Sequence, residues 1–386
     1  MLKNFLFVLN RFKTASVINI LGLSVALLVF FVVLMQVWYD FTYDRGYANA
    51  DRIVRLHIYM YDGTTDNSTT SINFQIPARI HDRLPEVEAY CMMTHWGNES
   101  FDIDKGSAMP ERYDNIPVAR TTQGFLRVFT PEITAGDTSA LFAAPGKAMI
   151  SEKTARRLFG GNDPIGQTIR YHYGNGALTV QAVYRDFPDN SSMPNGLYTY
   201  LQEYDEEEWS FRACFLLRPG TLATAREKLI AKEMIGEEIA QYLDEHPEVE
   251  YRLLFSSLND LYLDGPEGNR INTALSLLAI GLLTLVIAFV NFVNLSLAMA
   301  PSRVKNITIR KLMGANKTTL RLTVASESLL FTLIAAGMAF VGIRFLQGSA
   351  FAQELFPTIE FSLWSHARLF AVATGAILLL AFVIGL

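Results

Sequence analysis

The side chains of this 386-residue chain that could do chemistry are scattered and form no familiar catalytic motif. Gly146-Lys147 is followed by Ala148 and lacks the upstream glycine of a phosphate-binding P-loop. Neither H-E-x-x-H nor G-x-S-x-G occurs, and no nucleophile–base pair can be assigned from the sequence. The residues therefore indicate a protein that is not an enzyme and that carries no cofactor.

Two short segments resemble metal sites only in part. Cys91 and His95 are four residues apart, which would place them on one helical face, but a zinc site needs more ligands. Asp102-Ile103-Asp104-Lys105-Gly106 resembles the start of a calcium loop, but its glycine comes one position early and Tyr113 stands in place of the distal glutamate. A polar turn explains this segment better, and no metal site is expected.

Charged residues next to or within apolar stretches are better candidates for functional residues than these partial metal sites. The segment Arg303–Arg321 carries six basic residues and no acid, and it lies between two apolar stretches. Bare charge of this kind marks the cytoplasmic side of a membrane protein and by itself implies no partner. Glu327 is the one charged residue between Leu322 and Ile343. An ionisable group inside a membrane helix is costly unless it is paired or hydrated, so a functional role is the first hypothesis. The alternative is that Glu327 extends to the membrane interface.

Four uncharged or nearly uncharged stretches must position these residues: Thr14–Tyr39, Ile271–Ser302, Leu322–Ile343 and Leu369–Leu386. A bilayer core is crossed by about 20 helical residues; the first three stretches are long enough and the fourth is close. The sequence predicts a membrane α-helical protein with four spans, the last one incomplete, and a large α+β domain between spans 1 and 2. The expected boundaries are an amphipathic segment at 1–13, span 1 at 14–39, the α+β domain at 40–270, span 2 at 271–298, a basic loop at 299–321, span 3 at 322–346, a short loop at 347–367 and span 4 at 368–386.

The distribution of charge predicts the orientation. Residues 1–13 carry three basic residues and no acid, whereas residues 40–270 hold 22 basic and 35 acidic residues, a net charge of −13. Basic residues in short loops favour the cytoplasmic side. We therefore expect the N-terminus and residues 299–321 inside and the acidic domain outside.

The acidic domain alternates strand and helix patterns, which indicates the α+β class. Arg52–Tyr61 is rich in Ile, Val and Tyr and predicts a strand. Ser151–Phe159 predicts a short helix that Ser151 caps and Gly160 ends, and Leu222–Leu243 predicts one long helix. The only two cysteines, Cys91 and Cys214, fall here. Their number allows either a disulfide or two buried thiols.

Six segments resemble, in the same order, the MacB/FtsX-like permeases of ABC transporters, and together they run nearly the whole chain. One of them, within Ala148–Gly166, has the family's L-F-G turn and D-P-I-G sequence, formed here by Leu158, Phe159, Gly160, Asp163, Pro164, Ile165 and Gly166. The inner loop resembles the family's I-R-K-x-x-G-A stretch at Ile309–Ala315, although Asn306-Ile307-Thr308 stands where members usually have E-V-G. The other four are Asn49–Ile53, Leu84–Glu88, Tyr184–Pro188 and Leu258–Leu263.

The resemblance implies a permease subunit of the bacterial inner membrane that has no ATPase of its own. A separate ABC ATPase subunit would dock on the inner loop, at Arg303, Lys305, Ile309, Arg310, Lys311, Leu312, Met313, Gly314 and Ala315. ATP hydrolysis would move the periplasmic domain through the first two spans and so extrude a peptide, an antibiotic or a lipoprotein. The implied partners are that ATPase, a second permease half or copy, a periplasmic adaptor or substrate protein, and the lipid bilayer, with no nucleic acid.

The large form of the family repeats this module, and the sequence ends at Gly385-Leu386 within an apolar run. We therefore expect a second half to follow or to come from a partner chain. Two other classes remain open. A membrane-anchored sensor would bind a ligand with its periplasmic domain and signal inward, but the inner segments hold no kinase or cyclase domain. A periplasmic hydrolase would need a catalytic pair formed by residues far apart in the sequence.

Overall fold

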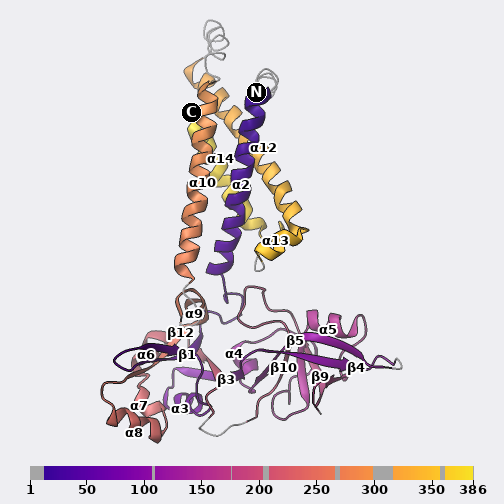
Figure 1. Ribbon diagram of the computed structural model, residues 1–386, viewed down its shortest axis with the longest axis vertical. Helices are drawn as coiled ribbons and strands as arrows, with labels where there is room; N and C mark the ends of the chain where they lie inside the picture. Colours follow the sequence, from indigo (N-terminus) through magenta and orange to yellow (C-terminus); the bar gives the residue numbers. More distant parts are fainter. Residues whose placement is uncertain are drawn as a thin grey trace. The chain divides into compact units, whose positions relative to one another are not determined.

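The apolar stretches form long helices in the computed structural model, which describes residues 13–106, 109–174, 176–202, 208–265, 270–298, 316–356 and 361–385. Four helices are long and apolar enough to cross a membrane, since a helix satisfies all its backbone hydrogen bonds internally. They run side by side in Figure 1 as α2 (Lys13–Phe41), α10 (Ile271–Ala298), α12 (Lys317–Gln347) and α14 (Ala367–Gly385), with the short α13 (Ala350–Leu355) between the last two in the chain.

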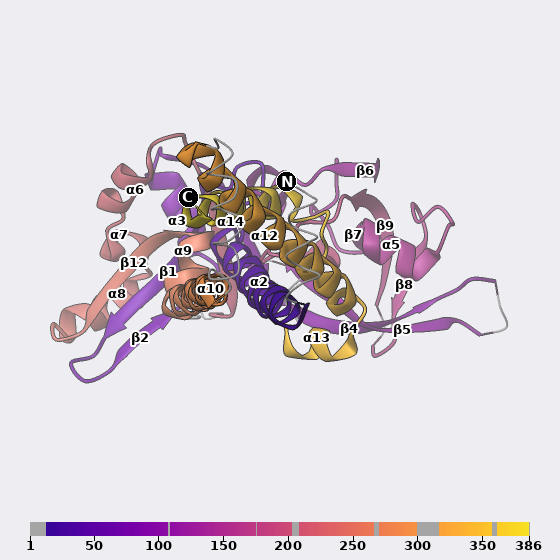
Figure 2. The same cartoon turned by 90° about the horizontal axis from the view of Figure 1, so that it is seen from above.

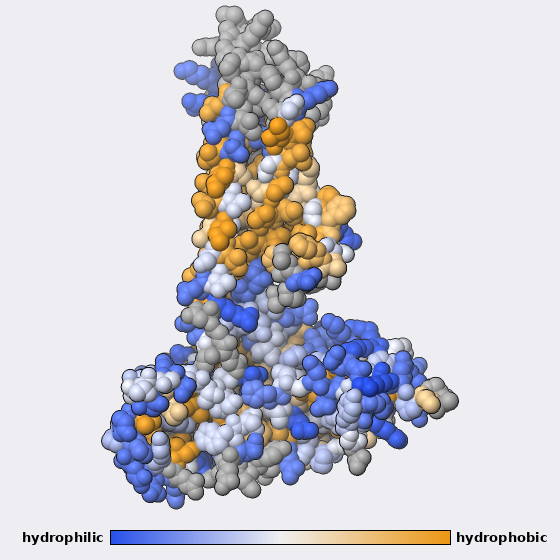
Figure 3. All heavy atoms as spheres, in the orientation of Figure 1, coloured by the Kyte–Doolittle hydropathy of each residue, from blue (hydrophilic) through white to orange (hydrophobic). Residues whose placement is uncertain are grey.

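The chain divides into a membrane unit, which holds these helices, and an inserted domain, Phe41–Arg270. Within the membrane unit, Phe31 of α2 is fully buried, and its ring stacks on Phe340 of α12 at 5.2 Å and meets Phe370 of α14 edge-on at 5.5 Å. Buried alanines at Ala335 and Ala339 line the same core, where small side chains let membrane helices approach closely. Figure 3 shows hydrophobic residues gathered over this unit and hydrophilic ones over the inserted domain.

The described residues of the inserted domain form twelve strands, all hydrogen-bonded into one sheet system. They are β1 (Ile53–Tyr61), β2 (Asp66–Thr69), β3 (Val87–Thr94), β4 (Gly97–Ile103), β5 (Glu111–Thr121), β6 (Ile133–Gly136), β7 (Lys147–Ser151), β8 (Thr168–Tyr171), β9 (Ala177–Tyr184), β10 (Leu197–Tyr200), β11 (Phe211–Leu217) and β12 (Glu250–Ser257). Together with the four membrane helices, this confirms the predicted fold class.

Six of the strands close into a ring, in the order β5-β10-β7-β9-β8-β4 and back to β5. The ring encloses an apolar core that includes Phe101, Ile150 and Val180, each fully buried. Helix α5 (Glu152–Phe159) packs on this core through Leu158. Figure 2 shows β4 and β5 as a long paired ribbon that extends outward from the ring.

Five of the other strands form an antiparallel sheet in the order β3-β11-β1-β12, with β2 on the edge of β1, and β6 pairs with β9 of the ring. Alternate residues of β11 lie in two different cores. Ala213 and Phe215 are buried in one core, and Cys214 and Leu216 are buried in the other. A sheet buried on both faces needs such apolar runs. The face that carries Ala213 and Phe215 is covered by four helices: α3 (Ile76–Arg83), α6 (Leu222–Lys228), α7 (Ala231–Met234) and α8 (Glu237–Glu245). Helix α4 (Phe125–Val128) packs in the core on the other face. Helix α9 (Leu258–Asp264) follows β12.

The prediction of one long helix over Leu222–Leu243 is wrong, because the structure has the three short helices α6, α7 and α8 there. Ala225, Met234 and Leu243 are all buried in the same core. At about 100° per residue, a single straight helix would turn Met234 about half a turn away from Ala225. The break between Leu229 and Ala231, and the extended backbone at Gly236, bring all three side chains to one core.

The two cysteines face each other across neighbouring strands, with Cys91 of β3 opposite Cys214 of β11 in the register. Both are free thiols and both are buried, at 0% and 1% exposure. Burial raises the pKa of the Cys91 thiol well above its usual value. A buried, protonated thiol is a poor nucleophile.

We therefore predict that neither cysteine of the native chain reacts with a maleimide on the timescale on which an exposed thiol is fully labelled. After denaturation without reductant, mass spectrometry should find two labels per chain. A denatured chain that takes no label would show instead that the two cysteines are joined in a disulfide.

Candidate functional site

The beginning and the end of the inserted domain are joined by the side chain of Asn259, at the start of α9. Its Nδ2 donates to the carbonyl oxygen of Tyr43 at 2.9 Å, and its Oδ1 accepts from the Arg45 guanidinium at 3.2 Å. Tyr43 follows the end of α2 at Phe41. Asn259 is 8% exposed, and breaking hydrogen bonds of a buried amide costs about 1–3 kcal/mol. We call residues 42–45 together with α9 the junction.

Aromatic contacts reinforce the junction. The rings of Tyr43 and Tyr262 stack with centroids 3.6 Å apart and planes within 10°. Arg270, the residue before α10, places its guanidinium 4.5 Å from the Tyr262 ring and donates to the Tyr262 hydroxyl at 2.9 Å. Ser257 caps α9 by accepting from the backbone N–H of Asp260 at 3.1 Å. A stack, a cation–π contact and a cap therefore fix the chain where it leaves for both α2 and α10.

Asp44, within the junction, has an unusual setting, since it is 3% exposed and has a left-handed backbone with φ 58°. Its carboxylate accepts from the Tyr47 hydroxyl at 3.1 Å and from the backbone N–H of Ser192 at 2.6 Å. Its own N–H donates to the carbonyl of Asn190 at 2.9 Å. Burial raises the pKa of Asp44 to about 6, and the bonds from Ser192 and Tyr47 oppose that rise.

The family-like turn after α5 is structural. Leu158 and Phe159 end the helix inside the ring core, at 0% and 6% exposure. Gly160 then takes φ 63°, a left-handed value that suits glycine at a helix end, and its N–H donates to the carbonyl of Arg156 at 2.9 Å. The predicted cap at Ser151 is present, because its hydroxyl accepts from the N–H of Thr154 at 3.1 Å.

The D-P-I-G sequence returns the chain to the ring. Asp163 accepts from the N–H of Ile165 at 3.0 Å across Pro164, which is the geometry of an Asx turn. Gly166 takes φ 80°, and its N–H donates to Val180 of β9 at 2.8 Å. These residues position a turn, and their side chains meet no group that would mark a catalytic site.

Glu327 lies inside the membrane unit on α12, where it is 8% exposed. Ser328 and Thr332 beside it are also buried, and Thr332 donates to the carbonyl of Ser328 at 2.9 Å within the helix. Polar side chains thus gather at one level of α12, and the functional role of Glu327 stays a prediction.

The predicted docking residues Arg303, Lys305, Ile309, Arg310, Lys311, Leu312, Met313, Gly314 and Ala315 lie outside the described residues. Of the six basic residues in the loop, Lys317 and Arg321 are described, and both are exposed on the first turns of α12. Their docking role stays a prediction.

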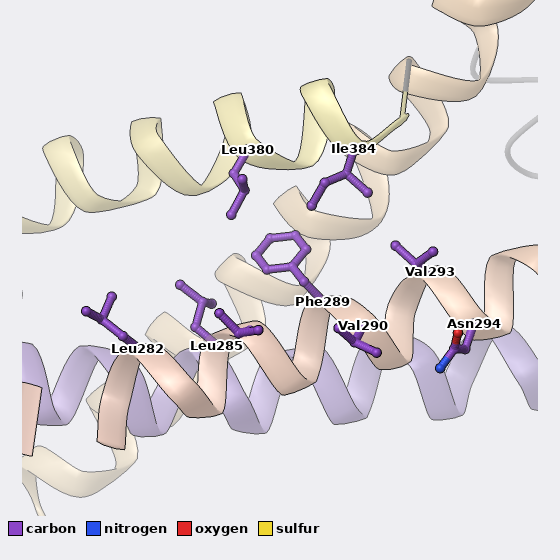
Figure 4. A pocket seen from close by; sticks show the side chains of 9 residues that line it. Leu282, Leu285, Phe289, Val290, Val293, Asn294, Leu380 and Ile384 are labelled. Carbon is purple, nitrogen blue, oxygen red and sulfur yellow. The ribbon is translucent and has the colours of Figure 1, made fainter. Parts of the chain in front are cut away.

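The membrane unit contains an apolar cavity of about 410 Å³ between α10 and α14. Figure 4 shows Phe289 of α10 pointing toward Leu380 and Ile384 of α14, with Asn294 as the one polar side chain among those labelled. Such a lining suits hydrocarbon, and it offers little to a polar ligand.

The absence of a metal site stays an expectation from the sequence, although within the described ranges no three His, Cys, Asp or Glu side chains gather as metal ligands. Cys91 lies on strand β3, so the helical face that would have paired it with His95 does not form. Asp102, at the end of β4, contacts the imidazole Nδ1 of His172 at 3.0 Å.

Sequence reasoning missed the junction. Leu258–Leu263 stood out only as a resemblance, and nothing marked Tyr43 or Asp44. Asn259 and Tyr43 are 216 residues apart, so no periodicity or spacing links them. The one usable signal was geometric: a domain inserted between two membrane helices must bring its two ends back to the same membrane surface.

The pH dependence of stability tests the buried carboxyl group. A folded-state pKa near 6, above the usual 3.8, means that the stabilising contribution of Asp44 is fully present below about pH 4 and is lost as the pH rises through 6. The Asp44→Asn variant keeps the acceptor and removes the charge. We expect it to unfold with higher free energy than the wild type at pH 7.5, by on the order of 2–3 kcal/mol, and the gap to close near pH 4.

Unfolding followed by tryptophan fluorescence of the intact chain in detergent, between pH 4 and 8, measures this gap. Asp51→Asn is the matched control, since Asp51 is exposed; its curve should run parallel to the wild type. A gap between Asp44→Asn and wild type that does not change with pH would contradict the buried-charge interpretation.

Comparison with known proteins gives two family matches. Residues 16–232 match the MacB-like periplasmic core domain, and residues 278–386 match the FtsX-like permease C-terminal domain. No curated protein matches the sequence significantly.

Three solved structures are similar to part of the chain. A domain of a protein described as a permease from Porphyromonas gingivalis is 20% identical (TM-score 0.47), covering 55% of this chain and 92% of that domain. The periplasmic region of MacB from Actinobacillus actinomycetemcomitans is 11% identical (TM-score 0.36; 54% and 90% covered). The extracellular domain of the noncanonic ABC-type transporter YknZ from Gram-positive bacteria is 14% identical (TM-score 0.34; 51% and 99% covered).

These structural similarities are low, and the assignment rests on the family models, which confirm the resemblance expected from the sequence. The first of them alone covers more than half of the chain. Together with four helices able to span a membrane, this places the chain in the MacB/FtsX-like family of ABC-transporter permeases, as a multi-pass membrane protein.

Proposed function

We propose that this permease couples ATP hydrolysis on a separate cytoplasmic ATPase subunit to movement of its inserted domain. The observation that supports the proposal is the junction, where Asn259 and Tyr262 of α9 contact the residues that follow α2 and so join the beginning and the end of the inserted domain. A shift of α2 or α10 would then act on these joined ends. This is the property of a lever, and it needs no open channel.

The proposed orientation places the inserted domain in the periplasm and the N-terminus in the cytoplasm of a bacterial inner membrane. The net charge of −13 over residues 40–270 and the six basic residues of Arg303–Arg321 support this placement. The ATPase would then meet the loop 299–321, and Glu327 would lie one to two helical turns further along α12.

Continuous helices support the mechanical part of the proposal. Helix α2 runs unbroken from Lys13 to Phe41, and only Thr42 separates its end from Tyr43. On the basis of the family resemblance, we propose that the transported molecule is a peptide, an antibiotic or a lipoprotein. A second permease half fits the apolar side chains that α10 leaves exposed, which include Leu283, Ile287 and Val290, because such a face needs either lipid or another helix.

The docking loop gives the first test. When Arg310 and Lys311 are both changed to Glu, the loop loses two positive charges and gains two negative ones, and an acidic docking surface should repel it. We expect an ABC ATPase to co-purify with the tagged full-length protein in mild detergent and to be lost, at least tenfold, in the double variant.

Changing Lys317 and Arg321 to Glu reverses the same number of charges on the first turns of α12 and is the matched control. If neither protein yields an ATPase, even after crosslinking in the membrane, the transporter proposal fails and the membrane-anchored sensor takes its place. Equal loss in both double variants would mean that the loop binds through net charge alone.

The junction gives the second test. Removing the Asn259 amide by Asn259→Ala, or the stacked ring by Tyr262→Leu, should leave the ATPase bound but uncouple it. Hydrogen–deuterium exchange of the inserted domain should change on adding ATP to the wild-type complex, and that change should fall at least fivefold in both variants.

Tyr262→Phe keeps the stack on Tyr43 and should keep most of the response, while Asn67→Ala removes an exposed amide of β2 and should keep all of it. An undiminished ATP response in Asn259→Ala and Tyr262→Leu would show that the movement enters the domain elsewhere.

A further inference from the structure

A polar cavity of about 370 Å³ opens on the inserted domain between α5, the middle of β5 and the loop that follows β9. This volume is within the range of ligand pockets, although it is near the lower end. Its lining residues are Asn115, Pro117, Lys153, Thr154, Arg157, Pro188, Asp189, Ser191, Met193, Pro194 and Asn195.

Two cations define the chemistry of this cavity. Lys153 and Arg157 are four residues apart on α5, so both point to the same face of the helix. Among the described residues neither belongs to an ion pair, whereas the neighbouring Arg156 pairs with Glu152 and Asp186. Like charges at this spacing destabilise a helix by about 0.2–0.5 kcal/mol. A bound anion would remove that repulsion.

The Arg157 guanidinium is held in place by neutral partners. It donates to the carbonyl oxygens of Asp114 at 2.6 Å and Asn115 at 3.3 Å. Asn115 has a left-handed backbone with φ 56°, a conformation that asparagine tolerates. The guanidinium is therefore positioned before any ligand arrives, while its charge is left for one.

The rest of the lining indicates the kind of anion. Pro117, Pro188 and Pro194 offer flat apolar surfaces, Met193 adds a buried side chain, and Asn195 is amide-bearing. Such a wall suits an extended backbone and apolar side chains better than a bare inorganic ion. Asp189 is the one acid of the lining, so the cavity holds two positive charges against one negative, in a domain that is acidic as a whole.

We propose that this cavity binds a short acidic segment of a peptide or protein, with a carboxylate of the ligand between Lys153 and Arg157. The ligand would come from the same side of the membrane as the inserted domain. Its recognition needs no ATPase, so this binding stands apart from the proposed transport function.

The same loop that forms one wall of the cavity also hydrogen-bonds to the first residues of the inserted domain. Ser191 lines the cavity, and its hydroxyl hydrogen-bonds to the Tyr47 hydroxyl. Asn190, next to it, accepts from the N–H of Asp44 at 2.9 Å and donates from its amide to Thr42 at 2.9 Å. Two bonds between Asn195 and the backbone of Phe187, at 2.7 and 2.8 Å, stiffen the loop. A ligand that moves the loop therefore acts on the junction, and this consequence rests on the proposed function.

Binding is measured by fluorescence anisotropy with the purified full-length protein and three labelled hexapeptides of sequence type Pro-x-Pro-x-Gly-x, in which x is Glu, Gln or Lys. We expect the Glu peptide to bind at least tenfold more tightly than the other two. Lys153→Glu should weaken it at least tenfold. Arg170→Glu reverses the same charge at an exposed position of β8 outside the cavity, and it should change the affinity less than twofold.

Equal affinity for the three peptides, or an equal loss in Lys153→Glu and Arg170→Glu, would overturn the proposal. Inorganic phosphate, or vesicles with anionic lipid, binding in a Lys153-dependent manner while the Glu peptide does not bind would overturn it as well, in favour of a small anion or a lipid headgroup. Lys153→Gln, which leaves the exposed position uncharged, repeats the test should the charge-reversed variant misfold.

The coupling is tested separately on the complex with the ATPase. The Glu peptide should change the ATPase rate of the wild type at least twofold. Tyr47→Phe, at a residue outside the cavity lining, should bind the peptide normally but lose that change, because its hydrogen bond to Ser191 is gone. Peptide binding without any effect on the wild-type rate would refute the coupling and leave the site intact, and a missing ATPase would refute the proposed function alone.

Discussion

The need to close an inserted domain on itself governs this structure. The 230 residues from Phe41 to Arg270 leave one membrane helix and return to another, so their two ends have to meet. One buried amide and one pair of stacked tyrosines satisfy that requirement. Because Asn259 bonds to the backbone of Tyr43 and to the side chain of Arg45, the two ends behave as a single attachment. The lever that we propose for ATP-driven movement follows from this attachment more directly than from any feature of the sheet.

The parts of the structure that depend on local sequence were predictable, and the parts that depend on distant pairing were not. Uncharged runs of about 20 residues or more identify membrane helices because lipid leaves the backbone no other option. Ser151 and Gly160 mark the ends of α5 because capping uses nearby backbone groups. The ring of six strands, the junction and the facing Cys91 and Cys214 join residues far apart in the chain. The error at Leu222–Leu243 has the same origin, since only the shared core shows that Met234 must turn inward.

The sequence signature and the candidate functional residues differ in physical role. Leu158, Gly160, Asp163 and Gly166 build a turn, so their identity follows from backbone geometry and packing. Asp44, by contrast, keeps a carboxyl group away from water, which disfavours its charge at neutral pH. Asp44 lies where the chain after α2 meets the loop that also lines the polar cavity beside Lys153 and Arg157. A buried carboxyl group at that point makes the contact sensitive to small movements of the loop, because its hydrogen bonds cannot be replaced by water.

The closed ring of strands has a consequence for how copies of this protein can associate. Exposed sheet edges present unpaired backbone groups that readily recruit a strand from another chain. Each of the six ring strands described here is hydrogen-bonded on both sides along part of its length. If two permease modules associate as we propose, their inserted domains would be brought close together. The paired stretches of the ring could not then accept a strand from the other module, so contacts along them would be made by side chains and could be released.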